Sequence, residues 1–376
     1  MKVIICGDLV VSNANAKYFA SGCIENIFSI DLLNKWYSCD FRIFNLEQPI
    51  CDDNHSPIAK SGPHLKCNSN ATLGIKTLNP SLVCLSNNHI MDYGKKGLEE
   101  TIEALKNVSI PFIGVGSNLN SAKKNSVFSY EKVSIINCCE HEFSFATESN
   151  FGAFSYSDYP VNNLIKQEKE KGNYVIVIYH GGKEEYRYPT PMLQKRCRLM
   201  VDSGADFITC QHSHCVGCYE KRNNSTVLYG QGNFLFEGYK NNDYWKTALM
   251  VEINTDTREI SYYPIVHDQI VRLASEDEKD TLNSFFERSE FIKNQSNVEK
   301  KFEEYVNANA VNYLCRLFCF SKFRTGLEKK IFKGFFVKKR IKKHAGLVLY
   351  NSLICEPHNE IIQKVLKDSF LKENKK

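Results

Sequence analysis

The sequence predicts an α/β protein, because strand-like and helix-like segments alternate over roughly the first 270 residues. Five strand-like apolar runs end, one after another, at polar residues of the kinds that bind ligands. In an open α/β sheet the carboxyl ends of the strands are where ligands bind. After about residue 272 the composition changes to a charged, helix-favouring stretch. We therefore expect one domain at 1–271 and a basic, helical C-terminal extension at 272–376.

The strand-like runs are short, and each is followed within a few residues by a polar, ligand-type side chain. The runs, each with the polar residues after it, are Val3–Cys6 with Asp8, Phe41–Leu46 with Glu47, Leu82–Leu85 with Asn88, Tyr174–Tyr179 with His180, and Phe207–Cys210 with His212 and His214. Further strands are expected at Phe128–Cys138, Thr226–Tyr229, Ala248–Ile253 and Glu259–Tyr263. Helices are expected at Gly97–Val108, where apolar residues recur on one face, and at Leu193–Val201.

The composition is that of a soluble globular protein, with 43% hydrophobic and 24% charged residues. Its 15 cysteines are scattered through apolar runs, and they are expected to be free thiols in a reducing cytosol. Cys215 and Cys218 have redox or zinc spacing, but no second pair accompanies them. No signal peptide and no apolar run of about 18 residues is visible, so we expect a cytoplasmic protein.

The positive charge is concentrated in the C-terminal part of the chain. Residues 271–376 carry a net charge of +8, whereas the preceding 270 residues carry −3. The stretch 316–343 holds eleven Lys/Arg and one acid, interleaved with phenylalanines. Three interpretations stay open: a helical cap whose phenylalanines pack on the core, a patch for peripheral contact with an anionic membrane or lipid-linked polymer, and nucleic-acid binding. Nucleic acid ranks last, because no recognised binding module accompanies the stretch.

The polar residues at the strand ends form a set suited to a divalent metal. Imidazole, carboxylate and carboxamide groups are ligands for Zn²⁺, Mn²⁺, Fe²⁺ and Mg²⁺. Residues i and i+2 of an extended segment point the same way, so His212 and His214 can face one site. His89 follows Asn88 directly and would point elsewhere, which suits a general acid or a group that stabilises charge. A purely structural role for the set and a metal-free site remain the alternatives.

A series of motifs gives the chain a family resemblance over roughly residues 1–265. It resembles the poly-gamma-glutamate capsule synthesis (CapA) family of the calcineurin-like metallophosphatase superfamily. The motifs are Gly7-Asp8, Asn45-Leu46-Glu47, Ser86-Asn87-Asn88-His89 with Asp92-Tyr93-Gly94, Thr101-Ile102-Glu103-Ala104-Leu105, Gly114-Val115-Gly116, His180-Gly181-Gly182-Lys183-Glu184, Asp202-Ser203-Gly204-Ala205-Asp206, His212-Ser213-His214 with Glu220, and Tyr229-Gly230-Gln231-Gly232-Asn233-Phe234.

The resemblance implies a four-layer α-β-β-α sandwich of metallophosphatase type, with a metal site across the strand ends. It implies that Glu47 bridges two ions, and that Asn88, His180 and His212 complete the shell of one. Asp8 and His214 would hold the other ion, and His89 would take the catalytic position. Four further residues are expected to contact the substrate or to orient a ligand: Asn45, Glu184, Glu220 and Asn233.

The chain departs from the phosphatase pattern at three positions. Typical phosphatases begin with Asp-x-His, but the third position here is Val10, so one site is expected to be complete and the second weak or empty. Gln211 replaces a glycine, and the bridging position is Glu47 instead of aspartate. The resemblance therefore implies a metal-dependent, phosphoesterase-like hydrolase of capsule, exopolysaccharide or poly-gamma-glutamate biosynthesis, acting on an anionic polymer or phosphorylated intermediate. The alternative is a non-enzymatic binding or scaffold protein that uses the same cleft.

Overall fold

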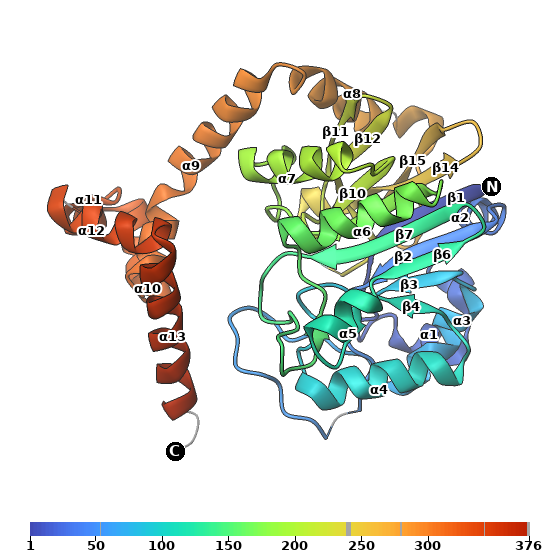
Figure 1. Ribbon diagram of the computed structural model, residues 1–376, viewed down its shortest axis with the longest axis horizontal. Helices are drawn as coiled ribbons and strands as arrows, with labels where there is room; N and C mark the ends of the chain where they lie inside the picture. The colour runs from blue at the N-terminus through green and yellow to red at the C-terminus, as the bar shows by residue number, and fades with distance from the viewer. Residues whose placement is uncertain (53, 238–241, 279, 342, 374–376) are drawn as a thin grey trace. The chain divides into compact units, whose positions relative to one another are not determined.

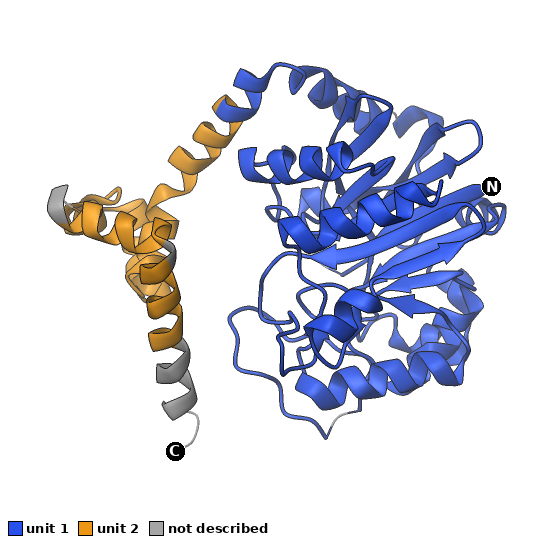
Figure 2. Ribbon diagram, in the orientation of Figure 1, with its two compact units in different colours: residues 1–299 blue, residues 300–376 orange. Residues whose placement is uncertain are grey.

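The computed structural model describes residues 1–376 except 53, 238–241, 279, 342 and 374–376. It divides into two compact units, Met1–Glu299 and Lys300–Lys376 (Figure 2). The first unit runs past the boundary expected near residue 272, because helix α8 (Asp280–Phe291) packs on strand β11 (Val216–Arg222). Arg288 donates hydrogen bonds from this helix to the backbone carbonyls of Val216 and Gly217. The helix thereby belongs to the α/β unit.

Two large β-sheets form the first unit (Figure 1). The larger sheet has the order β16-β15-β14-β1-β2-β3-β4, and β13 also pairs with β1. Strands β1, β2, β3 and β4 run parallel to one another. The bounds are β1 Lys2–Leu9, β2 Phe41–Leu46, β3 Leu82–Cys84, β4 Phe112–Ile113, β13 Asn233–Leu235, β14 Thr247–Asn254, β15 Glu259–His267 and β16 Val271–Leu273.

The smaller sheet has the order β11-β12-β10-β9-β7-β6, with β7, β9, β10 and β12 parallel. The single strand expected at 128–138 is wrong, because this segment forms an antiparallel hairpin that turns at Glu131, where φ is +52°. The bounds are β6 Val127–Tyr130, β7 Val133–Cys139, β9 Tyr174–His180, β10 Phe207–Gln211 and β12 Ser225–Gln231. A short pair consists of β5 Val115–Gly116 and β8 Gly152–Ala153.

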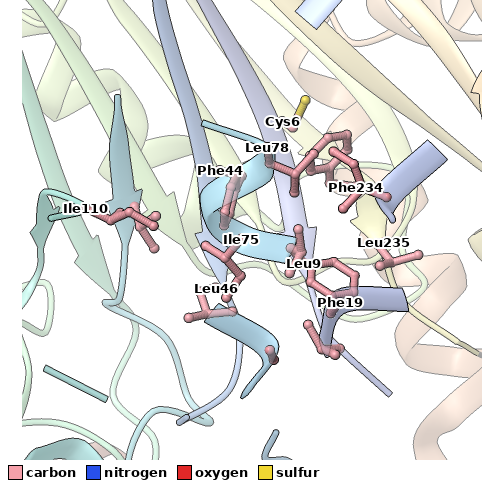
Figure 3. Packing of buried hydrophobic residues seen from close by; sticks show 14 of the residues in the cluster. Cys6, Leu9, Phe19, Phe44, Leu46, Ile75, Leu78, Ile110, Phe234 and Leu235 are labelled. Carbon is pink, nitrogen blue, oxygen red and sulfur yellow. The ribbon is translucent and has the colours of Figure 1, made fainter. Parts of the chain in front are cut away.

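Both faces of the central strands are buried, because successive side chains of a strand point to opposite faces. In β1, Val3 and Ile5 belong to a cluster that includes residues of both sheets. Ile4 and Cys6 belong instead to a cluster with α1 (Ala16–Ser21), α2 (Ile30–Tyr37), α3 (Thr72–Thr77) and α4 (Gly94–Asn107). Figure 3 shows part of that packing, including Phe19, Phe44 and Phe234.

A third apolar cluster joins the smaller sheet to its own helices. Val161 and Ile165 of α6 (Asp158–Glu170) and Met200 of α7 (Pro191–Asp202) are buried in one cluster with Val177 and Ile208 of the sheet. The short helix α5 (Leu119–Lys124) contributes Ala122 to the same cluster. Helices therefore pack against the sheet residues that point away from the inter-sheet cluster.

The second unit is helical. It contains most of α9 (Gln295–Leu317), then α10 (Lys322–Lys330), α11 (Phe335–Arg340), α12 (Lys343–Ile354) and α13 (Glu356–Glu373). Residues 279, 342 and 374–376 of the expected extension lie outside the described residues. Phe323 and Phe335 are 77% and 61% exposed, beside the lysines and arginines of this unit. Among the described residues, no helix combines the length and apolarity that are needed to cross a membrane.

Candidate metal centre

The carboxyl ends of neighbouring strands bring the predicted ligands together. Asp8 is near the end of β1, and Glu47 directly follows β2, the strand beside it. His180 is the last residue of β9, and His212 directly follows β10, which pairs with β9. All six predicted ligands, including Asn88 and His214, are buried. The predicted metal ligands, which come from both sheets, thus lie together in one buried site.

The two histidines after β10 do not lie in an extended segment, so that expectation is wrong. The strand ends at Gln211, and both His212 and His214 have left-handed backbones, with φ of +75° and +53°. The backbone N–H of His212 donates to Asp8 Oδ2 at 3.2 Å, which holds the turn against β1. The imidazole rings still lie near each other, with centroids 5.8 Å apart. A turn, and not strand alternation, places them at one site.

The four residues expected to hold one ion lie close to each other. His180 Nε2 is 3.0 Å from Asn88 Oδ1 and 3.2 Å from Glu47 Oε1. His212 Nδ1 is 4.0 Å from the same glutamate oxygen. The two histidine rings have centroids 4.8 Å apart. These groups therefore surround the Oε1 side of Glu47.

The residues expected to hold the other ion gather around His214. Its Nδ1 lies 3.5 Å from Asp8 Oδ2 and 4.0 Å from Glu47 Oε2. Asp8 also approaches the first set, since its Oδ1 lies 3.4 Å from His180 Nδ1. Val10 is buried and offers no donor atom. This second set consequently has one imidazole and two carboxylates, one of them shared.

The donor set and its unpartnered atoms fit a divalent cation. Ligand atoms of Asp8, Glu47 and His180 all lie within 4.8 Å of one another, and so do those of Glu47, His212 and His214. Within the described residues, neither carboxylate oxygen of Glu47 has a well-formed hydrogen bond, and neither does His212 Nδ1. Buried polar atoms are normally hydrogen-bonded. A cation between these atoms would satisfy them.

Opposite charges shift the pKa values of this cluster. Burial lowers the pKa of His180 and His214, but the carboxylates of Glu47 and Asp8 outweigh burial and raise the values to about 10 and about 9. Burial raises the pKa of Glu47, yet the imidazoles of His214 and His180 hold it well below its usual range. Without a metal, the carboxylates are thus ionised and these two imidazoles carry protons.

His89 directly follows Asn88 in the chain, and its side chain contacts two charged groups. Its Nδ1 is 2.7 Å from Asp92 Oδ2 and 3.1 Å from the ammonium of Lys60. Lys60 and Asp92 form a buried ion pair, and Asp92 also accepts a hydrogen bond from the backbone N–H of Leu65. Nδ1 is therefore the ring nitrogen that faces these groups.

The four residues expected to contact the substrate or orient a ligand differ from one another in what they contact. Asn45 Nδ2 donates to Asp8 Oδ1 at 2.7 Å and lies 3.2 Å from His180 Nδ1, and Asn233 Oδ1 lies 2.8 Å from His214 Nδ1. Glu184 is half-exposed. Burial raises the pKa of its carboxyl group, but the nearby His212 outweighs this effect, and the pKa lies below its ordinary value. The Glu220 carboxylate instead accepts hydrogen bonds from Tyr229, Gln194 and Arg198 and touches no ligand.

Sequence reasoning missed Glu140, Lys60 and the contact of Asp92 with His89. Glu140 directly follows β7, so it carries the same signal as the other strand ends, an apolar run followed by a ligand-type residue. Lys60 lies in a loop with no periodic pattern. None of the fifteen cysteines, all of which lie within the described residues, forms a disulfide. Burial raises the pKa of Cys215 to about 11, so this thiol is not poised to react.

Comparisons with known proteins agree with the motifs. The family described as bacterial capsule synthesis protein PGA_cap matches residues 2–238. The chain belongs to this family. It is 28% identical over 205 residues to the PGA biosynthesis protein CapA of Bacillus subtilis (strain 168), covering 53% of each chain. It is 29% identical over 211 residues to the capsule biosynthesis protein CapA of Bacillus anthracis, covering 53% of this chain and 51% of the relative.

The chain matches only about half the length of these two curated relatives. Among solved structures, a hypothetical protein from Thermus thermophilus matches 71% of this chain and 100% of its own length, with a TM-score of 0.41 and 12% identity. A likeness of that degree supports no argument about the site.

Proposed function

We propose that this PGA_cap family member is a metal-dependent hydrolase, phosphoesterase-like, that acts in the biosynthesis of a capsule polymer such as poly-gamma-glutamate or an exopolysaccharide. The observation that carries the proposal is Glu47, a fully buried carboxylate whose two oxygens face three imidazoles and have no well-formed hydrogen bond within the described residues. The family and the printed names of the relatives support the capsule role. The two sheets and their helices fit the four-layer α-β-β-α sandwich of metallophosphatases.

The residues for a metal are those that the strand ends bring together: Asp8, Glu47, Asn88, His180, His212 and His214. The donors suit Mn, Fe, Zn or Mg, and the set without a second imidazole is the weaker one. A bound divalent ion supplies Lewis-acid activation of water and of an ester. Asn233 Oδ1 can accept the Nδ1 proton of His214, and Asn45 donates a hydrogen bond to Asp8.

His89 is the proposed catalytic residue, because it is the imidazole beside the cluster that is held by Asp92 and not by a ligand. Its Nε2 would hold or move a proton at the substrate. Lys60, whose ammonium lies 3.1 Å from His89 Nδ1, also pairs with Asp92, so it holds that carboxylate in place and adds no net charge. The proposed substrate is anionic, either a polymer with carboxylates or a phosphorylated intermediate, because a bound divalent ion would attract it.

The second unit is proposed to make peripheral contact with an anionic membrane face, on the cytoplasmic side. Its exposed Phe323 and Phe335 stand among basic side chains, the combination that binds anionic interfaces. The full chain should co-sediment with vesicles that contain anionic lipid and stay in solution with zwitterionic vesicles. Phe323→Ser with Phe335→Ser should weaken the binding, and equal binding to both vesicle types would contradict the proposal.

A binding protein without turnover is the second candidate, and Val10 favours it because it leaves one ligand set short. Such a protein would hold the anionic polymer even after chelation. It would cleave no phosphoester.

Elemental analysis of purified protein, followed by a phosphomonoester and phosphodiester screen with and without chelator, tests the proposed hydrolase. Wild-type protein should carry Mn, Fe or Zn and lose turnover on chelation. His212→Ala should lose most of the metal, whereas His55→Ala should keep it, because His55 pairs with Glu100 outside the cluster. Wild-type protein that holds no metal even after reconstitution would refute the proposal.

A further inference from the structure

The carboxylate of Glu140 lies on the far side of a ligand ring. Its Oε1 is 3.4 Å from Nε2 of His212, while Nδ1 of the same ring faces Glu47 Oε1 at 4.0 Å. Nδ1 is buried and has no hydrogen-bond partner within the described residues. The two nitrogens of this imidazole thus face two different carboxylates, one inside the cluster and one outside it.

Glu140 is itself tied to the ligand-bearing strands. Its backbone N–H donates to the carbonyl of His180 at 3.0 Å, and its Oε2 accepts a hydrogen bond from the backbone N–H of Gly182 at 3.3 Å. β7, which it follows, pairs in parallel with β9, where Cys139 lies opposite His180. One carboxylate oxygen is therefore held by the backbone beyond β9, and the other is left for the ring that follows β10.

We infer that Glu140 is a positioning residue for the metal centre, which accepts the Nε2 proton of His212 and so presents Nδ1 as the metal-binding atom. An imidazole that donates one N–H to a carboxylate keeps the lone pair of its other nitrogen for a metal, and its ring orientation is fixed. The left-handed backbone of His212 gives the ring no strand to align it, so the contact with Glu140 supplies the alignment. The inference rests on the proposed metal site.

Glu142 supplies a matched comparison. Its carboxylate is within 4.8 Å of the Glu140 and His212 ligand atoms, but Glu142 is exposed. If the three groups bound an ion of their own, both glutamates would matter. If Glu140 acts through the ring, only Glu140 matters.

Titration of metal-free full-length protein with Mn²⁺, followed by electron paramagnetic resonance, tests the inference. Glu140→Ala should weaken Mn²⁺ binding about 10- to 100-fold. Glu140→Gln, which keeps an acceptor oxygen, should fall between wild type and Glu140→Ala, and Glu142→Ala should match wild type. The thermal midpoint of each metal-free variant reports its folding, and Glu140→Gln keeps the test decisive if Glu140→Ala does not fold.

A double variant separates positioning from direct binding. Adding Glu140→Ala to His212→Ala should cause no further loss of affinity, because the carboxylate acts only through that ring. A further loss would make Glu140 a ligand and overturn the inference, as would unchanged affinity in Glu140→Ala or an equal loss in Glu142→Ala. If the variants give any of these contrary results while wild type binds Mn²⁺, the role of Glu140 is refuted and the proposed function stands. If wild type binds no metal, both the role of Glu140 and the proposed function are refuted.

Discussion

Filling both ligand sets of metal-free protein with divalent ions should release about two protons near pH 7.5, one from each set. With pKa values raised to about 10 and about 9, His180 and His214 are almost fully protonated in metal-free protein at that pH. A ligand imidazole must lose its proton when it binds a metal. Each of these two rings should therefore release one proton.

The size of the effect follows from the proton count. Each released proton changes the apparent affinity about tenfold per pH unit, so each of the two ions should bind about tenfold more weakly for every unit below about pH 9. The same two histidines also make the free energy of unfolding of the metal-free protein depend on pH. Because their pKa values are raised in the fold, they stabilise it fully below the unfolded value of about 6.5. That contribution is lost as pH rises through 9 to 10.

Calorimetric titration with Mn²⁺ in two buffers of different ionisation enthalpy measures the released protons directly. With both ligand sets filled, the slope of binding enthalpy against buffer enthalpy should correspond to about two protons for wild type. It should correspond to about one for His214→Gln, which leaves only the set that contains His180. The histidine variant keeps the polar volume but removes one titrating ring. Tight Mn²⁺ binding with a slope near zero would refute the charge assignment of the cluster.

Three further predictions concern other residues of the first unit, and one of them uses a control substitution in the second unit. Asp92→Asn should lower unfolding stability by about 3–5 kcal/mol in denaturant titrations, since it leaves the buried Lys60 ammonium unpaired; a change under about 1 kcal/mol would contradict this. Gly7→Ala should destabilise by at least about 2 kcal/mol, because the added Cβ would lie 1.9 Å from the carbonyl oxygen of Gly232, whereas Gly326→Ala has open space and should not lower the thermal midpoint. Cys215→Ser should keep full Mn²⁺ binding, and loss of metal would show that this thiol is a ligand.

Much of the strand pattern could be predicted locally. The strand expected at Phe41–Leu46 has those bounds, and those expected at 174–179 and 207–210 are each one residue longer in the structure. Such runs are recognisable because strands buried on both faces are continuously apolar. The hairpin at Glu131 was missed for the same reason: both of its strands are rich in β-branched and aromatic residues, and the turn contains no glycine.

The sequence by itself determined the types of the site residues, because ligand-type side chains directly follow apolar strands and retain that order along the chain. It also determined the family, through motifs that the match over residues 2–238 confirms. Only the tertiary structure decided which nitrogen of His212 faces Glu47, that Glu140 approaches the other nitrogen, and that Glu220 lies elsewhere. Those facts depend on strand pairing and on left-handed turns, which bring together residues far apart in the chain and leave no periodic signal within it.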